Sequence, residues 1–316
     1  MQKQFDVLVV GELNVDLILN QIEKFPEIGK ETLASNMNLT LGSSSAIFAS
    51  NLSTLGSSVA FAGKLGHDNF GDHIIASLKS RGVDTQFILR SNKHATGATI
   101  VLNFGEDRAM VTYQGAMKYL TLNDISAYAM LASRHLHLSS IFLQTGLADD
   151  LIDLFRKAKE QGMTTSIDPQ WDPAEKWNVD LERLLPFVDV FMPNLKELCA
   201  LTGKDSLGHA LDVLKPYCNI VVIKNGSNGA SLWDGDNLIH QEAFLNREVV
   251  DSIGAGDSFD AGFIHRFLQK RPLAECLELG ALTGAINTTR PGGTNAFENL
   301  DMIRNIARST FNYVLS

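Results

Sequence analysis

The chain has 316 residues, of which 45% are apolar and 20% are charged, and its formal net charge is −9 at pH 7. This ordinary composition excludes a disordered chain, and the acidic balance without a basic run argues against nucleic acids and anionic membranes as partners. No apolar stretch approaches the length of a membrane span. The three cysteines are widely spaced and form no metal-binding or disulfide pattern, which favours a reducing cytoplasm.

Strand and helix patterns alternate along the chain from residue 135 onward. Before that point we expect a helix at 70–80 and strands at 5–10, 58–62, 98–102 and 109–113. After it we expect strands at 135–138, 164–167, 188–192 and 220–223, and helices at 148–161, 195–201, 207–214, 258–269 and 273–288. The alternation predicts a parallel sheet with helices on both faces, and the strand-rich region before residue 120 predicts a separate small sheet.

Residues 251–263 are the most informative segment and read Asp-Ser-Ile-Gly-Ala-Gly-Asp-Ser-Phe-Asp-Ala-Gly-Phe. An apolar helical pattern begins after Asp257, so Gly254, Ala255 and Gly256 form a turn at a helix N-terminus, where free N–H groups attract an anion. A carboxylate beside such a turn makes sense where it orients a hydroxyl that attacks a bound phosphoryl group. We therefore expect Asp257 to be a catalytic base and the three residues before it to form an anion hole. A simple helix cap is the alternative.

Two further polar pairs follow predicted strands. Asn14 and Asp16 point to the same side of an extended segment, and a carboxylate accepts hydrogen bonds from two neighbouring hydroxyls, which suits a polyol; a solvated turn is the alternative. Asn194 and Glu197 share one face of a helix, and this pair suits Mg²⁺, which keeps several waters and takes few carboxylates; a capping pair is the alternative.

Several segments resemble the PfkB, ribokinase-like, family of carbohydrate kinases. Residues 251–263 resemble its second signature, and residues 42–56 resemble its Gly-Gly-x-x-x-Asn-x-Ala motif, although Ser43 stands at the second Gly and Ile47 at the usual Asn. The resemblance runs from residue 11 to residue 294, with the motifs in family order. It implies one ribokinase-like kinase domain over residues 1–316, a three-layer α/β/α sandwich with a small β-sheet lid from segments of about 12–42 and 96–116. The lid is also the expected surface of a homodimer.

The resemblance also implies roles for individual residues. The residues expected to bind the substrate are Asn14, Asp16, Gly42, Ser43, Ser44, Arg108 and Asp168, with Arg108 as a candidate partner for an acid group. Those expected to bind the nucleotide are Lys224, Gly226 and Gly229; the alternative for Lys224 is that its stem only covers the sheet. Asn194 and Glu197 are expected near Mg²⁺, and a monovalent cation, K⁺, is expected at Asp251, Ile253, Arg290 and Gly292.

The expected reaction is transfer of the γ-phosphoryl group of ATP, with Mg²⁺, to a hydroxyl of a small unphosphorylated sugar or sugar acid. Ile47 removes a polar contact, which favours a fructose-like or 2-keto-3-deoxygluconate-like acceptor over ribose. Ser44 stands where ribose-specific members often carry Lys, and its lack of charge argues against a sugar phosphate. The alternatives are a nucleoside kinase on the same scaffold and a non-catalytic sugar-sensing protein.

Overall fold

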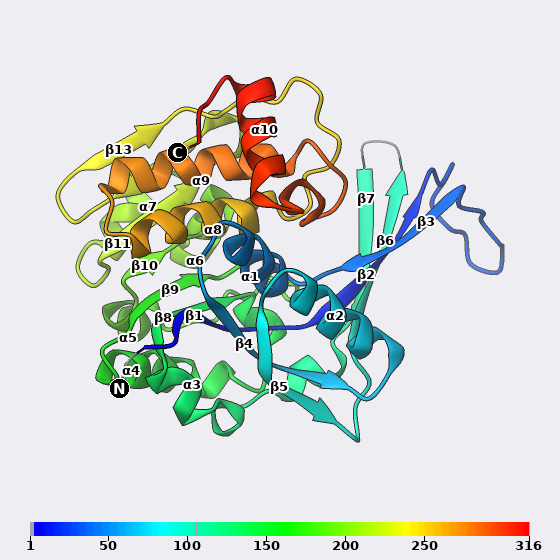
Figure 1. Ribbon diagram of the computed structural model, residues 1–316, viewed down its shortest axis with the longest axis horizontal. Helices are drawn as coiled ribbons and strands as arrows, with labels where there is room; N and C mark the ends of the chain where they lie inside the picture. Colours follow the sequence, from blue (N-terminus) through cyan, green and yellow to red (C-terminus); the bar gives the residue numbers. More distant parts are fainter. Residues whose placement is uncertain (1–2, 105–106, 316) are drawn as a thin grey trace.

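The computed structural model describes residues 3–104 and 107–315. Within these residues, nine strands form the main sheet, and four strands form a second, smaller sheet. Figure 1 shows helices on both sides of the main sheet and the small sheet projecting from one end of the body. The chain therefore has the three-layer α/β architecture that the sequence predicts, with a second small sheet.

The main sheet is parallel except at one edge. Its strands lie in the order β13 (Leu238–Gln241), β12 (Ala230–Trp233), β11 (Ile220–Lys224), β10 (Val190–Phe191), β9 (Thr164–Asp168), β8 (Ser133–Ser139), β1 (Phe5–Val10), β4 (Val59–Gly66), β5 (Asp84–Ser91). The pairs β11–β12 and β12–β13 are antiparallel, and the remaining neighbours are parallel. Because parallel strands need crossover connections, helices cover both faces.

Two hydrophobic cores fill the space between the sheet and its helices. In β1, Val7 and Val9 face one core, while Leu8 and Val10 face the other, as the two-residue period of a strand requires. The first core packs under α1 (Ser44–Thr54), α2 (Asn69–Ser80), α8 (Ala255–Leu268), α9 (Leu273–Asn287) and α10 (Leu300–Phe311). The second packs under α3 (Ala127–Leu131), α4 (Leu151–Glu160), α5 (Leu181–Leu184), α6 (Leu195–Thr202) and α7 (Leu207–Leu214).

The small sheet has the strand order β3 (Asn36–Leu41), β2 (Asn14–Asn20), β6 (Gly97–Phe104), β7 (Asp107–Tyr113). β2 and β6 are parallel, and the outer pairs are antiparallel. Alternate residues therefore face opposite sides, so that Asp16 and Thr99 share one face while Leu17 and Ile100 share the other.

The structure corrects several expected elements. β4 and β5 lie within the region before residue 120, yet they pair with the main sheet, because β4 lies next to β1. The strand expected at 188–192 is reduced to β10, because a 3₁₀ turn occupies Leu185–Phe187 just before it. Within residues 3–104 and 107–315, no helix is both long enough and apolar enough to cross a membrane.

Candidate active site

A pocket of about 660 Å³ lies at the carboxyl ends of the parallel strands. Its walls include the start of α1, the turn after β11, the start of α8 and the end of α9. Ligands of open α/β sheets bind at this edge. The small sheet contributes Asp16, Val101, Arg108 and Met110, so the pocket lies between the two sheets.

The first turn of α8 forms one wall of the pocket. Gly254 is the N-cap, with a φ of 74°, and Ala255 and Gly256 follow inside the helix. A side chain at position 254 would also meet the Cα atom of Gly293 at 2.7 Å, so only glycine fits there. The first N–H groups of a helix have no partner within it, and the helix dipole adds positive potential. The turn therefore offers free N–H groups to an anion in the pocket.

Asp257 lines the pocket directly after this turn, and only 6% of the residue is exposed. Its Oδ1 atom accepts a hydrogen bond of 3.0 Å from Nε2 of Gln170. Burial raises the pKa of Asp257 to about 7; the neighbouring carboxylate of Asp168 adds to this rise, and Lys224 opposes it. A carboxylate with this pKa takes up and releases a proton near neutral pH, as a general base must.

A buried ion-pair network lies next to Asp257. Nζ of Lys224 donates to Oδ2 of Asp168 at 2.7 Å and to both carboxylate oxygens of Asp260 at 3.1 Å. Burial alone would lower the pKa of Lys224, but the two carboxylates outweigh this effect and raise it. Nε2 of Gln170 also donates to Asp168 at 2.7 Å, so this glutamine joins the network to Asp257.

This network corrects two expectations. Asp168, expected to bind the substrate, is fully buried and does not line the pocket, because its carboxylate is used by Lys224 and Gln170. Lys224, expected to reach a phosphate, does line the pocket, but two buried carboxylates already balance its charge. Both residues support the site rather than supply free charge to it.

Asn14 and Asp16 lie side by side on β2, as their spacing predicts. Nδ2 of Asn14 donates to Oδ1 of Asp16 at 3.0 Å and to Oγ1 of Thr99 at 3.0 Å. Gly42 packs against both, because a Cβ atom at this position would meet Nδ2 of Asn14 at 2.7 Å and overlap Oδ1 of Asp16. Burial raises the pKa of Asp16 to about 6. The carboxylate is thus held at the pocket with part of its hydrogen-bonding capacity in use.

The start of α1 brings two serines to the pocket. Ser43 is the N-cap, and its Oγ atom donates to the backbone oxygen of Glu12 at 2.6 Å. Ser44 lines the pocket, and a hydrogen bond from its side chain to Asp257 favours the charged carboxylate. The side chain of Glu12 lies buried beside this turn and accepts from the backbone N–H of Ser45 at 3.2 Å.

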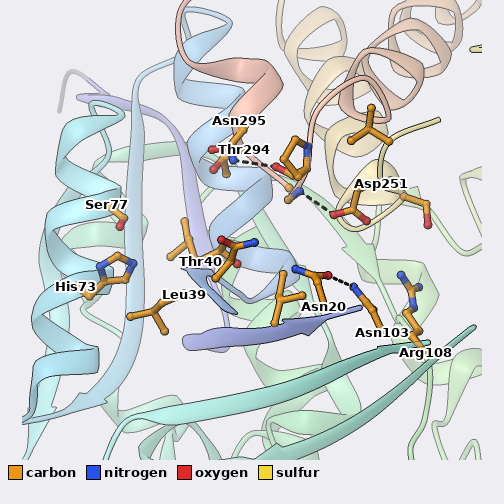
Figure 2. Close-up of a pocket in the computed structure, with 18 of the residues that line it drawn as sticks. Asn20, Leu39, Thr40, His73, Ser77, Asn103, Arg108, Asp251, Thr294 and Asn295 are labelled. Carbon is orange, nitrogen blue, oxygen red and sulfur yellow. Dashed lines mark hydrogen bonds between the residues drawn. The ribbon is translucent and has the colours of Figure 1, made fainter. Parts of the chain in front are cut away.

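A second pocket, of about 880 Å³, lies between the small sheet, α2 and residues 291–295. Figure 2 shows Asn20 hydrogen-bonded to Asn103, at 2.7 Å, with Arg108 beside them on the small sheet. Arg108 is exposed and lines both pockets. It can therefore reach a ligand in either one, and its role as partner of an acid group stays a prediction.

The turn after β11 forms another wall of the first pocket. Gly226 has a φ of 56° and open space around it, which lets a ligand approach the backbone. Gly229 also lines the pocket, but a side chain there would collide with the carbonyl of Gln241 on β13. This second glycine is therefore required by strand packing, whether or not a nucleotide binds beside it.

Asn194 and Glu197 line the same pocket and cap α6. The backbone N–H of Asn194 donates to Oε2 of Glu197, and the N–H of Glu197 donates to Oδ1 of Asn194, both at 2.9 Å. Burial and the charge of Asp168 raise the pKa of Glu197 to about 7, while Lys224 opposes this. Among the residues that the structure describes, no three His, Cys, Asp or Glu side chains gather as a metal cluster. One carboxylate and one amide oxygen fit a Mg²⁺ ion that keeps most of its waters.

N–H groups of the chain bind three oxygen atoms of the residues expected at a monovalent cation. Oδ1 of Asp251 accepts from the N–H of Ile253 at 2.9 Å, and Oδ2 accepts from the N–H of Gly292 at 2.8 Å, the bond drawn at Asp251 in Figure 2. The Ile253 carbonyl accepts from Nδ2 of Asn287 at 2.6 Å. Arg290 is exposed and lines neither pocket. A K⁺ ion needs oxygen atoms in place of its water shell, and three of the oxygen atoms expected around it here already accept an N–H group.

The sequence interpretation missed three polar residues of the site: Gln170, which is half-buried, and Glu12 and Asp260, which are buried. Gln170 follows the end of β9 with a φ of 59°, so strand spacing did not predict its contact with Asp168. Asp260 stands three residues after Asp257, which places both on one helix face, and this spacing was a signal. For Glu12 the only signal was its position next to Asn14 and Asp16.

Comparisons with known proteins identify the family of the chain. Residues 4–300 match the model of the pfkB family carbohydrate kinases. An uncharacterized sugar kinase of Archaeoglobus fulgidus is 30% identical over 234 residues, which are 74% of this chain and 92% of that protein. A 2-dehydro-3-deoxygluconokinase of Bacillus subtilis is 27% identical over 92% of this chain and 91% of that protein. A solved structure of a putative ribokinase II from E. coli, in complex with ATP and Mg²⁺, has a TM-score of 0.83 at 23% identity and covers 96% of this chain and 99% of that one. The chain therefore belongs to the pfkB family of carbohydrate kinases.

Proposed function

We propose that this kinase transfers the γ-phosphoryl group of ATP to a hydroxyl of a small unphosphorylated sugar or sugar acid, of the fructose or 2-keto-3-deoxygluconate kind. The position of Asp257, directly after the anion-binding turn and with its pKa raised to about 7, carries the proposal. The acceptor oxygen attacks the γ-phosphorus and forms a new O–P bond, the bond to the β-phosphate oxygen breaks, and ADP leaves. The hydroxyl proton passes to Asp257, while residues 254–256 stabilise the charge on the phosphoryl oxygens.

The acceptor is bound from the small sheet and from the start of α1. Asp16 pairs two neighbouring hydroxyls, next to Asn14 and Gly42, and Ser43 and Ser44 face the reacting hydroxyl. The lining of the pocket favours an acceptor without a phosphate group, because its cations are Arg108, which is exposed, and one lysine whose charge is already balanced. Arg108 suits the single charge of a sugar acid. One of the relatives, the 2-dehydro-3-deoxygluconokinase, is named for an acceptor of this class.

Ribokinase-like kinases use ATP and Mg²⁺, and we propose that both bind in this pocket. We place the nucleotide against the turn that holds Gly226 and Gly229, with its terminal phosphate toward the start of α8. When bound, Mg²⁺ neutralises charge on the phosphates. Asn194 and Glu197 would hold it, chiefly through water. The Oε1 atom of Glu197 is not used by the helix cap, which takes Oε2.

The small sheet is proposed to act as a lid and as a dimer surface. It bears Asp16 and Arg108 on the face toward the pocket, so its approach to the body would exclude water from the phosphoryl group. Its other face exposes apolar side chains, with exposed fractions of 42% for Ile100, 64% for Val111 and 58% for Tyr113. A patch of this kind marks an interaction surface, and a second lid with the same face is its simplest partner. Light scattering in solution would test the dimer.

A coupled ADP-release assay tests the function. The acceptors are fructose, tagatose, 2-keto-3-deoxygluconate, ribose and adenosine, each with ATP and Mg²⁺. We expect turnover with a keto sugar or a sugar acid. A clear preference for adenosine would identify a nucleoside kinase instead, a preference for ribose would refute the inference from Ile47, and sugar binding without ADP release would identify a sugar sensor.

A further inference from the structure

Three carbonyl groups around the anion-binding turn are held by side-chain donors of the protein. Ile253 and Gly254 supply two of them, and Gly293, in the facing loop, supplies the third. Nδ2 of Asn287 donates to the Ile253 oxygen at 2.6 Å, and Oγ of Ser258 lies within hydrogen-bond distance, 2.8 Å, of the Gly254 oxygen. Each donor is fully buried.

A second amide completes the cluster. Nδ2 of Asn51, on α1, donates to the Gly293 oxygen at 2.9 Å and to Oγ of Ser258 at 2.9 Å. Oδ1 of Asn287 lies 3.0 Å from the same hydroxyl. Side chains from α1, α8 and α9 thus tie the turn to the loop that faces it. The network is not fully satisfied, because Oδ1 of Asn51 is buried without a hydrogen-bond partner among the described residues.

The backbone carbonyl of Ile253 determines which way the side-chain amide of Asn287 points. A backbone carbonyl can only accept hydrogen bonds, so the group that lies 2.6 Å from the Ile253 oxygen must be the amide nitrogen. The positive end of the amide dipole therefore faces the carbonyl. The Ile253 oxygen thus faces a partial positive charge, as it would if it bound a cation.

We propose that the amide of Asn287 takes the place of the monovalent cation, so that this kinase works without K⁺. Asn287 is a positioning residue: it fixes the carbonyl that precedes the anion-binding turn and does not touch the substrates. The carboxylate of Asp251 supports the same arrangement, because each of its oxygens holds a backbone N–H group of the turn or of the facing loop. The inference rests on the proposed role of residues 254–256 as the anion hole.

The first test uses the unmodified protein. Its ADP-release rate and its melting temperature are measured in potassium chloride and in tetramethylammonium chloride at equal ionic strength. We expect both quantities to be the same in the two salts. A rate or a melting temperature that rises in potassium would show that the site still takes the ion and would overturn the proposal.

Two variants test the role of the amide. Asn287→Ala should lower kcat about fivefold to tenfold with little change in the sugar KM, since about one net hydrogen bond behind the anion hole is lost. Asn287→Asp places a carboxylate where the amide was, so its kcat and melting temperature should be low in tetramethylammonium and should rise in potassium. The matched control is Asn219→Ala, because Nδ2 of Asn219 also donates to a backbone carbonyl, that of Val188, at 2.8 Å. Asn219 lies just before β11, at the end of this strand that is opposite to the pocket.

The outcomes separate this inference from the proposed function. If the wild type turns over no acceptor, the melting temperatures in the two salts still decide whether the site takes potassium. An Asn287→Ala variant with wild-type kcat would overturn the positioning role. So would an Asn287→Asp variant whose melting temperature does not respond to potassium. The control variant Asn219→Ala should have the same kcat and the same melting temperature in both salts.

Discussion

Replacing Asp257 by Asn removes the proposed base and leaves the shape of the site almost unchanged. The asparagine oxygen can still accept the hydrogen bond that Gln170 donates at 3.0 Å. The substitution also removes a carboxylate whose charged form is disfavoured by burial. The variant should therefore fold and bind ATP, and a melting temperature close to that of the wild type would confirm that the site is intact.

The expected loss of activity follows from the role of the carboxylate. A positioned general base contributes about 10²–10⁴-fold to a rate, so kcat should fall by that factor above neutral pH. The pH dependence of the wild-type kcat tests the same role of Asp257. Asp257 must be ionised to accept a proton, so with a pKa of about 7 its kcat should fall as the pH drops, by about tenfold for each pH unit below that value.

The assay is coupled ADP release at saturating ATP and acceptor, over a range of pH, for both proteins. The wild type should show a rising limb with a midpoint near pH 7, and the variant should show no such limb. Two results would refute the role of Asp257. One is a variant within a few-fold of the wild-type kcat, and the other is a variant that keeps the wild-type limb.

Further substitutions separate acceptor binding, proton transfer and stability. Asp16→Ala should raise the sugar KM about 10- to 100-fold and leave the ATP KM unchanged, since a hydrogen bond to a charged group contributes about 1.5–3 kcal/mol; an unchanged sugar KM would remove this residue from the site. Because burial raises the pKa of Asp16 to about 6, the wild-type sugar KM should itself rise as the pH falls through that value. Gln170→Ala removes a donor to the ionised form of Asp257, so the midpoint of the kcat profile should move up by about one pH unit, and an unmoved midpoint would contradict the contact. Lys224→Met leaves two buried carboxylates without their cation and should cost about 3–5 kcal/mol of unfolding free energy in a denaturant titration, so a fully stable variant would contradict the ion-pair network.

Local patterns in the sequence predicted eight strands and six helices of the described residues. They missed strands β2, β3, β5, β12 and β13 and helices α1, α3, α5 and α10. The turn at Gly254 was predictable because small residues stand directly before an apolar helical pattern. The start of α8 lies at Ala255, three residues earlier than the expected 258, because Ala255, Gly256 and Asp257 carry no apolar signal. The pairing of β4 and β5 with the main sheet was not predictable, since a strand pattern shows that a strand forms and does not show which neighbour it takes.

The sequence indicated several polar residues of the candidate site, but it did not indicate the ion pairs that hold Lys224 in place. Asn14 and Asp16 are two residues apart, so their alignment followed from strand geometry alone. The partners of Lys224 lie 56 and 36 residues away in the sequence, at Asp168 and Asp260, and no local pattern connects them. For this reason Lys224 was expected to bind the nucleotide.

The transfer of label from ATP tests the central proposal most directly. The purified chain is incubated with Mg²⁺, ATP labelled in the γ-phosphoryl group, and either a keto sugar or a sugar acid, and the products are separated. The label should move to a phosphate ester of the acceptor much faster than to inorganic phosphate, and the Asp257→Asn variant should lose this transfer. Label that appears only in inorganic phosphate, at a rate independent of the acceptor, would contradict the proposed function.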